Sequence, residues 1–163
     1  QEGQLTLNSK PFSMNNLIDT LQQTANLELI QKNKPVVLET HKELENEDDL
    51  LNSDREKVMQ ILSTLLSNAI NFTTTGKIDI GYQLQNNSVH FYVSDTGKGI
   101  AEETQKTLFT NYLYHTSATC NVGEGAGLSL FLAAGLSKLL GGTLRLEWSS
   151  PHGSKFCLSI PMN

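Results

Sequence analysis

The sequence is short of cysteine and of long apolar runs. Its 163 residues include two cysteines, Cys120 and Cys157, and neither belongs to a CxxC pair, which excludes a disulfide framework and a zinc ribbon. Free thiols suggest a reducing compartment, and we expect a cytoplasmic protein. No stretch reaches the roughly 18 apolar residues that a membrane-spanning helix needs, so we expect no direct membrane insertion by this chain.

Positive charge is also scarce. The chain has 12 Lys and Arg against 17 Asp and Glu, which gives a net charge of −5. This charge argues against nucleic acid as a partner, because nucleic-acid binding needs clustered basic residues. Hydrophobic residues still make up 38% of the chain, which suits one ordinary packed domain. The first residues form neither an initiator methionine nor a signal peptide, so we expect an excised piece of a longer protein.

Hydrophobic spacing predicts an alternation of helices and strands. We expect Ser13 to cap a helix over 14–29, and Ser53 to form a capping box with Glu56 at the start of a second helix that ends near Phe72. Strands are expected over 4–7, 35–40, 78–84, 89–93, 144–148 and 156–160, with a hairpin turn at Asn86-Asn87, loops over 43–49 and 110–124, a short helix up to Phe109 and a helix over 128–139. This order predicts a two-layer α/β sandwich, with a mixed, mostly antiparallel sheet and helices on one face.

The helix expected after Ser53 carries a polar stripe that ends in short amide and hydroxyl side chains. Opposite its apolar face lie Lys57, Gln60, Thr64, Ser67, Asn68 and Asn71. Asparagine is a poor helix former, because its side chain competes for backbone hydrogen bonds. The stripe is therefore either a solvent-facing surface or a source of neutral oxygen ligands for a hydrated hard cation.

A carboxylate is expected on the core side of a strand. Asp95 shares strand parity with Val89 and Val93, so its side chain should point to the same face. A buried carboxylate needs a partner. Two interpretations stay open: an Asx-type turn onto the following backbone, or an acceptor at the floor of a pocket that takes a hydrogen bond from a ligand amino group. In the second case Gly97 and Gly99 would let the ligand approach the backbone.

A glycine-rich loop precedes the last predicted helix. Gly123, Gly125 and Gly127 stand where a helix N-terminus can offer unpaired amides to phosphate oxygens, although such a loop can also be a mere flexible connection. No GK[ST] follows, which excludes a Walker loop, and the GxGxG spacing does not fit a Rossmann site.

In this order and spacing, the three motifs resemble the ATP-binding catalytic domain of sensor histidine kinases, the Bergerat ATP-binding fold that gyrase and the mismatch-repair ATPases share more distantly. Residues 60–73 are similar to the N box of that family, 95–100 to its G1 box, 108–109 to its F box and 123–128 to its G2 box. The resemblance implies a catalytic domain over 13–163, preceded over 1–12 by the exit from an upstream dimerisation helix and a first strand.

The resemblance also implies roles for single residues. Asn68 would ligate magnesium, and Asp95 would accept a hydrogen bond from the adenine amino group of ATP. The other implied ATP-binding positions are Thr64, Asn71, Gly97, Gly99, Ile100, Phe109, Gly123, Gly125, Gly127, Leu128 and Ser154. The reaction would be in-line transfer of the γ-phosphoryl group to a histidine.

The resemblance further implies partners. His41, His90, His115 and His152 do not match the acceptor context of the family, so the acceptor would lie on an upstream dimerisation and histidine-phosphotransfer domain. A response regulator would be the second partner. The parent protein, anchored in the inner membrane or free, would work in the cytoplasm.

The chain departs from the family pattern in its charges. The family usually has Asn in place of Thr64 and a basic residue in place of Asn71. It often has Arg or Lys in place of Asn111 and a small hydroxyl residue in place of Glu124, and residues 109–125 contain no Lys or Arg. A like charge at roughly 4 Å from a phosphate costs about 4 kcal/mol at an effective dielectric of about 20. The alternative function is therefore a degenerate, nucleotide-weak pseudokinase domain that acts as a regulatory or partner-binding module.

Overall fold

The computed structural model of the chain describes residues 6–109 and 126–162. In chain order its elements are β1 (Lys10–Ser13), α1 (Met14–Gln31), β2 (Val36–His41), β3 (Leu50–Ser53), α2 (Arg55–Phe72), β4 (Gly76–Gln85), β5 (Ser88–Asp95), α3 (Glu102–Lys106), α5 (Ala126–Leu139), β6 (Thr143–Ser150) and β7 (Gly153–Pro161). Among the described residues, no helix has the length and apolar character needed to cross a membrane.

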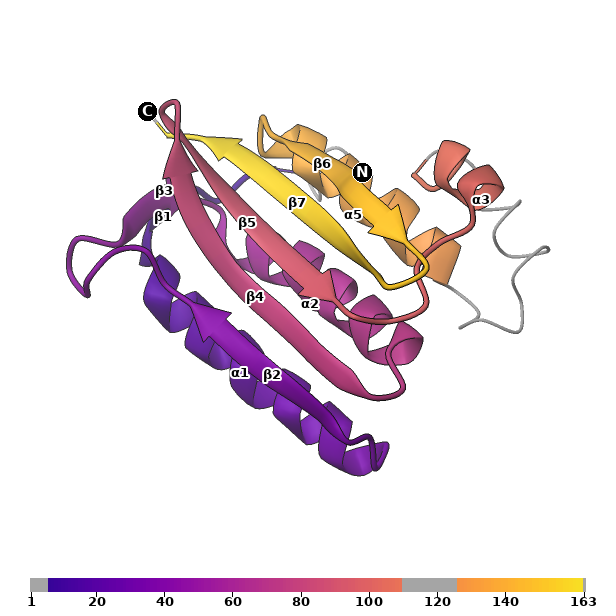
Figure 1. Ribbon diagram of the computed structural model, residues 1–163. Helices are drawn as coiled ribbons and strands as arrows, with labels where there is room; N and C mark the ends of the chain where they lie inside the picture. Colours follow the sequence, from indigo (N-terminus) through magenta and orange to yellow (C-terminus); the bar gives the residue numbers. More distant parts are fainter. Residues whose placement is uncertain (1–5, 110–125, 163) are drawn as a thin grey trace.

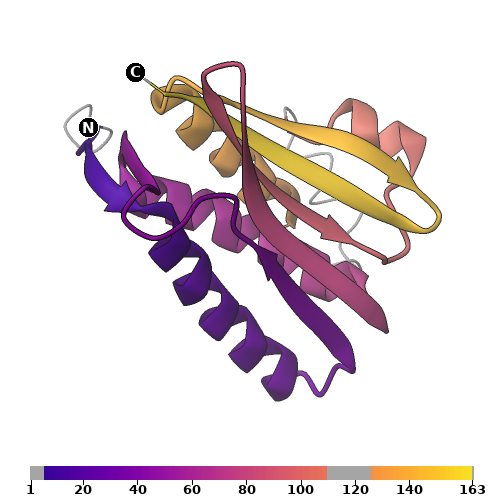
Figure 2. The same cartoon turned by 60° about the vertical axis from the view of Figure 1, so that its left-hand side comes forward.

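The large sheet has the strand order β2-β4-β5-β7-β6. β2 pairs with β4 in parallel, and the other neighbouring strands pair antiparallel. Helices α1, α2 and α5 lie along one face of this sheet, as Figures 1 and 2 show. The predicted two-layer sandwich with a mixed, mostly antiparallel sheet is confirmed.

The core lies between these helices and the sheet. On α2 the buried apolar residues recur at spacings of three and four: Val58, Ile61, Leu62, Leu65, Leu66 and Ala69. Alternate residues of β5 face them, and its burial pattern changes at every residue from Ser88 to Asp95. The apolar face of the helix and the apolar face of the strand therefore pack together in one core layer, as their sequence periods predicted.

Helices α1 and α2 lie parallel to each other. Arg55 Nη2 donates to Asn16 Oδ1 at 3.1 Å near their N-terminal ends, and Ser67 Oγ donates to Glu28 Oε1 at 3.2 Å farther along. Both pairs join residues that are 39 positions apart. The C-terminal ends of the two helices therefore lie side by side, although no local sequence signal connects them.

The start of α2 corrects the sequence prediction by one residue. Asp54 caps the helix, since its carboxylate accepts a hydrogen bond from Lys57 N at 3.2 Å. Ser53 is instead the last residue of β3, paired with Lys10, so the predicted capping box of Ser53 and Glu56 is wrong. Aspartate is as good an N-cap as serine and adds a favourable negative charge at the helix N-terminus, which leaves Ser53 free to stay in the strand.

A second sheet of two strands was not predicted. β1 pairs antiparallel with β3, and Phe12 faces Leu51, both of them buried. The strand expected over 4–7 is wrong at Thr6 and Leu7, which have no regular structure, while positions 4 and 5 lie outside the described residues. Each real strand has only four residues and buries one large apolar side chain, too little for an alternating pattern to stand out. Ser13, at the end of β1, does cap α1 as predicted.

The β4–β5 hairpin is confirmed at Asn86 and Asn87. Both residues have positive φ, 54° and 61°, as a two-residue type I′ turn requires, and asparagine tolerates this conformation. The turn fixes the register of the two strands, which places Ile78 opposite Asp95 at the far end. This turn therefore helps to position the carboxylate of the candidate site.

Candidate functional site

Asp95 lies at the end of β5 with its side chain in the protein interior, as its parity predicted. Its exposure is 4%, and Oδ1 accepts a hydrogen bond from Gly97 N at 2.8 Å, which forms the Asx-type turn. Burial raises the pKa of the Asp95 carboxyl, and hydrogen bonds from the backbone of Gly97 and Ser154 offset only part of this effect. A carboxylate has about four acceptor positions, so it can cap the turn and still accept from a ligand.

Hydrogen bonds fasten the turn after Asp95 to the β6–β7 hairpin. Ile100 N donates to Ser149 Oγ at 2.9 Å, and Ser149 Oγ lies 2.8 Å from Ser154 Oγ. Ser154, a predicted site residue, is buried and stands directly opposite Asp95 in the β5–β7 register. Sequence reasoning missed Ser149, because only the pairing of β6 with β7 brings this serine to Ser154.

Gly97 and Gly99 are required by the fold itself. A Cβ on Gly97 would overlap the carbonyl group of Phe72, at the end of α2. Gly99 has φ +79°, and a Cβ there would overlap the carbonyl group of Ser150. The turn is thus held closely between α2 and the β6–β7 hairpin, a packing reason for both glycines that the sequence did not reveal.

Gly99→Ala is expected to lower the free energy of unfolding by about 2 kcal/mol, because it combines a positive φ with backbone overlap. The matched control is Gly135→Ala in α5, where a Cβ meets nothing within 4 Å. There the higher helix propensity of alanine should raise stability by about 0.5–1 kcal/mol. Urea unfolding measures both changes, and a Gly99→Ala domain as stable as the wild type would contradict the packing role.

Two buried polar atoms lie near the C-terminal end of α2 without hydrogen-bond partners among the described residues. They are Nδ2 of Asn68, whose side chain is 4% exposed, and Oγ1 of Thr73, which is fully buried. Leaving such an atom unpaired costs about 1–3 kcal/mol. An amide side chain can offer its oxygen to a cation and its nitrogen to a phosphate oxygen, so Asn68 fits its predicted role.

The end of α2 also touches the turn that follows Asp95. Lys98 N donates to Phe72 O at 3.3 Å, and a Cβ on Gly97 would lie 3.0 Å from Thr73 Oγ1. The structure therefore brings together two of the motifs that the sequence singled out, from segments that are far apart in the chain. Thr73 was missed as a candidate, because a threonine just after a helix carries no signal of its own.

The other two predicted residues of α2 are more exposed. Thr64, one turn before Asn68, is half-buried, and its hydroxyl donates to Gln60 O at 3.0 Å within the helix. Asn71 is exposed, and its Oδ1 accepts a hydrogen bond from Lys32 Nζ at 2.7 Å.

The remaining predicted residues follow the turn. Ile100 packs against the core, and Phe109 packs edge-on against Phe156 with ring centroids 6.1 Å apart. Gly127 and Leu128 belong to the first turn of α5, as expected for a loop that opens a helix. Gly123 and Gly125, and with them Asn111 and Glu124, lie outside the described residues.

Lysine side chains gather at the C-terminal end of α2. Lys34 Nζ donates to Ile70 O at 2.5 Å and to Thr73 O at 3.2 Å, so it neutralises the negative end of the helix dipole. Burial lowers the pKa of the Lys34 ammonium group. Lys98 Nζ lies 5.8 Å from the ring centroid of Phe72. No local sequence pattern predicts this cluster, because its members come from two separate connections between elements.

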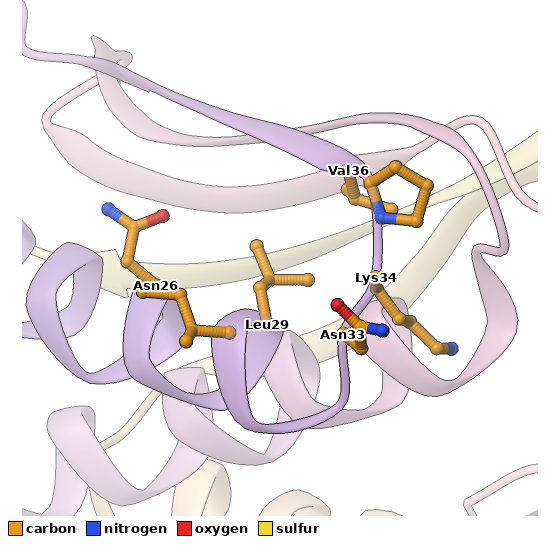
Figure 3. A pocket seen from close by; sticks show the side chains of 7 residues that line it. Asn26, Leu29, Asn33, Lys34 and Val36 are labelled. Atoms are coloured by element: carbon orange, nitrogen blue, oxygen red, sulfur yellow. The ribbon is translucent and has the colours of Figure 1, made fainter.

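A cavity of about 470 Å³ lies elsewhere, between the end of α1 and β2, and Figure 3 shows it. It is lined by Asn26, Leu29, Ile30, Asn33, Lys34, Pro35 and Val36. None of these residues was predicted to bind ATP, although one of them, Lys34, also donates to the carbonyl groups at the end of α2.

One group of side chains on the outer face of β2 and β4 could hold a metal ion. Glu39, His41 and Asp79 place ligand atoms within 4.8 Å of one another. Lys77 Nζ, however, lies 3.6 Å from Glu39 and 3.8 Å from Asp79, and His41 Nε2 lies 2.9 Å from Asp79 Oδ1. These groups already neutralise one another, and Asp95 points to the opposite face.

Comparison with known proteins shows the family of the chain. The sequence model of the family described as histidine kinase-, DNA gyrase B- and HSP90-like ATPase matches residues 53–163. The chain therefore belongs to this family of ATPases. Its predicted resemblance to the ATP-binding catalytic domain of histidine kinases is confirmed by relatives and solved structures.

The circadian input-output histidine kinase CikA of Synechococcus elongatus is 34% identical over 166 aligned positions, which cover 99% of this chain and 21% of CikA. The chain thus spans about a fifth of that relative. The catalytic domain of the histidine kinase ThkA superposes with a TM-score of 0.73 at 27% identity, over 95% of this chain and 98% of that one. ThkA has also been solved in complex with the response regulator TrrA. Full-length ShkA in complex with AMPPNP has the same fold, with a TM-score of 0.77 at 22% identity, over 96% of this chain and 32% of ShkA.

Proposed function

We propose that this domain binds Mg-ATP and transfers the γ-phosphoryl group to a histidine on an upstream domain of a sensor kinase. The observation that carries the proposal is the meeting of two motifs: the end of α2, with the unpaired Asn68 amide, and the turn after the buried Asp95. Membership of the ATPase family supports ATP as the ligand.

Different residues contact the base, the magnesium ion and the phosphates of the nucleotide. Asp95 accepts a hydrogen bond from the adenine amino group, and Gly97, Gly99 and Ile100 shape the walls around the base. Asn68 offers its oxygen to magnesium, which when bound neutralises phosphate charge and aligns the γ-phosphoryl group. The amides at the start of α5 face the phosphates, because a helix N-terminus attracts anions. Positioning and charge neutralisation are the main needs of phosphoryl transfer.

The proposal includes partners in the cytoplasm. The upstream dimerisation and phosphotransfer domain of the same polypeptide supplies the acceptor histidine, and a response regulator receives the phosphoryl group. The complex of ThkA with TrrA supports a response regulator as the second partner.

A degenerate pseudokinase is the second candidate function. The observation in its favour is the absence of Lys and Arg over residues 109–125, where the resemblance implies phosphate contacts. In that case the same fold serves as a regulatory or partner-binding module.

Calorimetric titration with Mg-AMPPNP distinguishes the two functions. A working kinase domain should bind at micromolar concentration, and Asn68→Ala or removal of magnesium with EDTA should abolish most of that binding. The matched control is Asn26→Ala, which changes an exposed asparagine of α1 that was not predicted to bind ATP and should leave affinity unchanged. A wild-type domain that binds nothing at millimolar nucleotide would reject the kinase proposal in favour of the partner-binding module.

A further inference from the structure

Lys32 places an ammonium group at the last turn of α2. It is the C-cap residue of α1, and its Nζ lies 2.7 Å from Asn71 Oδ1 and 2.9 Å from Glu28 Oε2. Asn71 itself has no charge. The parallel course of α1 and α2, seen in Figure 2, thus gives this position of α2 a positive charge from another element.

This ammonium group contacts a residue that lies less than one helical turn from Asn68 on α2. Asn71 follows Asn68 by three residues, so the two side chains are about 60° apart around the helix, with Cβ atoms roughly 5–6 Å apart. Thr64 lies in the same sector, about 40° from Asn68. The stripe from Asn68 to Asn71 therefore leads from the proposed magnesium ligand directly to Lys32.

We propose that Lys32 is a phosphate-binding residue of the nucleotide site, which supplies from α1 the charge that position 71 lacks. The inference rests on the proposed function. The side chain of Lys32 is 41% exposed, so its flexible stem can move the ammonium group from Asn71 to a phosphate oxygen.

The neighbouring lysines are less suited to this role. Lys34 Nζ is held by main-chain carbonyl oxygens at the end of α2, and moving it would uncap the helix. Lys98 lies over the ring of Phe72. Lys32, by contrast, contacts one neutral amide oxygen and one carboxylate among the described residues.

Glu28 pairs with Lys32 and limits how strongly this lysine can bind a phosphate. Its Oε2 pairs with Lys32 Nζ at 2.9 Å, while its Oε1 accepts from Ser67 Oγ at 3.2 Å. This carboxylate competes with a phosphate for the same ammonium group and repels the phosphate as well. Glu28→Gln should therefore strengthen binding of a triphosphate a few-fold.

The test compares dissociation constants for Mg-AMPPNP and for adenosine, which has no phosphates. Lys32→Gln removes the charge but keeps a donor for Asn71, and it should weaken Mg-AMPPNP binding about tenfold without changing adenosine binding. The double variant Lys32→Gln with Asn71→Lys moves the charge onto α2 and should restore most of the affinity. The matched control is Lys42→Gln, which removes a lysine that pairs with Asp19 far from this stripe and should change neither constant.

Each failure has a distinct meaning. Unchanged Mg-AMPPNP binding in Lys32→Gln would overturn the inference and leave the proposed function standing. An equal loss for adenosine and Mg-AMPPNP would also overturn it, because the lysine would then act on the fold rather than on phosphate. A wild-type domain that binds neither ligand would overturn the inference together with the proposed function.

Discussion

Asp95→Asn is expected to lower the affinity for adenine nucleotides by about a hundredfold. Asparagine has one side-chain oxygen, which the backbone of Gly97 would occupy as it occupies Asp95 Oδ1 now. The amide NH₂ group would then face the adenine amino group, donor against donor. Losing a hydrogen bond to a charged group costs about 1.5–3 kcal/mol, and each 1.4 kcal/mol is about tenfold in affinity.

Titration with adenosine and with Mg-AMPPNP measures this effect, and both ligands should lose affinity equally, because the change acts on the base. The matched control is Asp79→Asn in the neighbouring strand, whose side chain lies on the outer face and pairs with His41. Wild-type affinity for adenosine in Asp95→Asn would contradict the proposed adenine contact.

Asp95→Asn should also change the pH dependence of the free energy of unfolding. Burial raises the pKa of Asp95 in the folded state above its unfolded value of 3.8. The folded domain therefore binds more protons than the unfolded chain between these two pKa values, so this group contributes stability that is lost as the pH rises through that window. Asp95→Asn should remove this contribution, which urea unfolding at a series of pH values would detect.

Asp49→Ala is expected to lower the free energy of unfolding by about 3 kcal/mol, because it leaves buried donors unpaired. The carboxylate of Asp49 is 1% exposed and accepts from Ser13 Oγ at 2.5 Å, from Asn15 N at 2.9 Å and from Glu47 N at 3.0 Å. It thus joins the start of α1 to the acidic segment 43–49. That segment was predicted to be a loop, and its last residue is buried.

The effect of Asp49→Ala should depend on pH. Burial by itself would raise the pKa of Asp49, but the hydrogen bonds from Ser13, Asn15 and Glu47 outweigh it and the pKa is lowered. The stabilisation is therefore complete above the unfolded pKa of 3.8 and is lost as the pH falls through the lower, folded pKa.

Urea unfolding of Asp49→Ala and wild type at neutral and acidic pH tests both the loss of stability and its pH dependence. The neighbouring Asp48 is exposed, and Asp48→Ala serves as the control with an expected change within about 0.5 kcal/mol. A difference between Asp49→Ala and wild type that grows in acid would contradict the assigned hydrogen bonds.

Local periodicity was enough to predict much of this domain. Strand parity placed Asp95 in the interior, the asparagines of α2 marked the helix whose end contacts the turn after Asp95, and the asparagine pair at 86–87 fixed the hairpin. These features depend on residues close together in the chain, where sequence spacing translates directly into geometry.

The features that escaped prediction depend on distant segments. The choice between Ser53 and Asp54 as a cap was decided by the pairing of β1 with β3. The contact of Lys32 with Asn71 follows from the parallel packing of α1 and α2, for which one sequence contains no local signal. The reasons for Gly97 and Gly99 lie in carbonyl groups of two other elements.

The turn after Asp95 is held from both sides, by α2 through the bond from Lys98 N to Phe72 O and by the β6–β7 hairpin through the bond from Ile100 N to Ser149 Oγ. The part of the site that is proposed to hold adenine is therefore preorganised. A ligand that binds there loses little free energy to ordering the backbone, so even adenine without its ribose and phosphates can be recognised. Selectivity among bases then follows from rigidity, because a fixed acceptor cannot shift to suit a base that lacks the amino group.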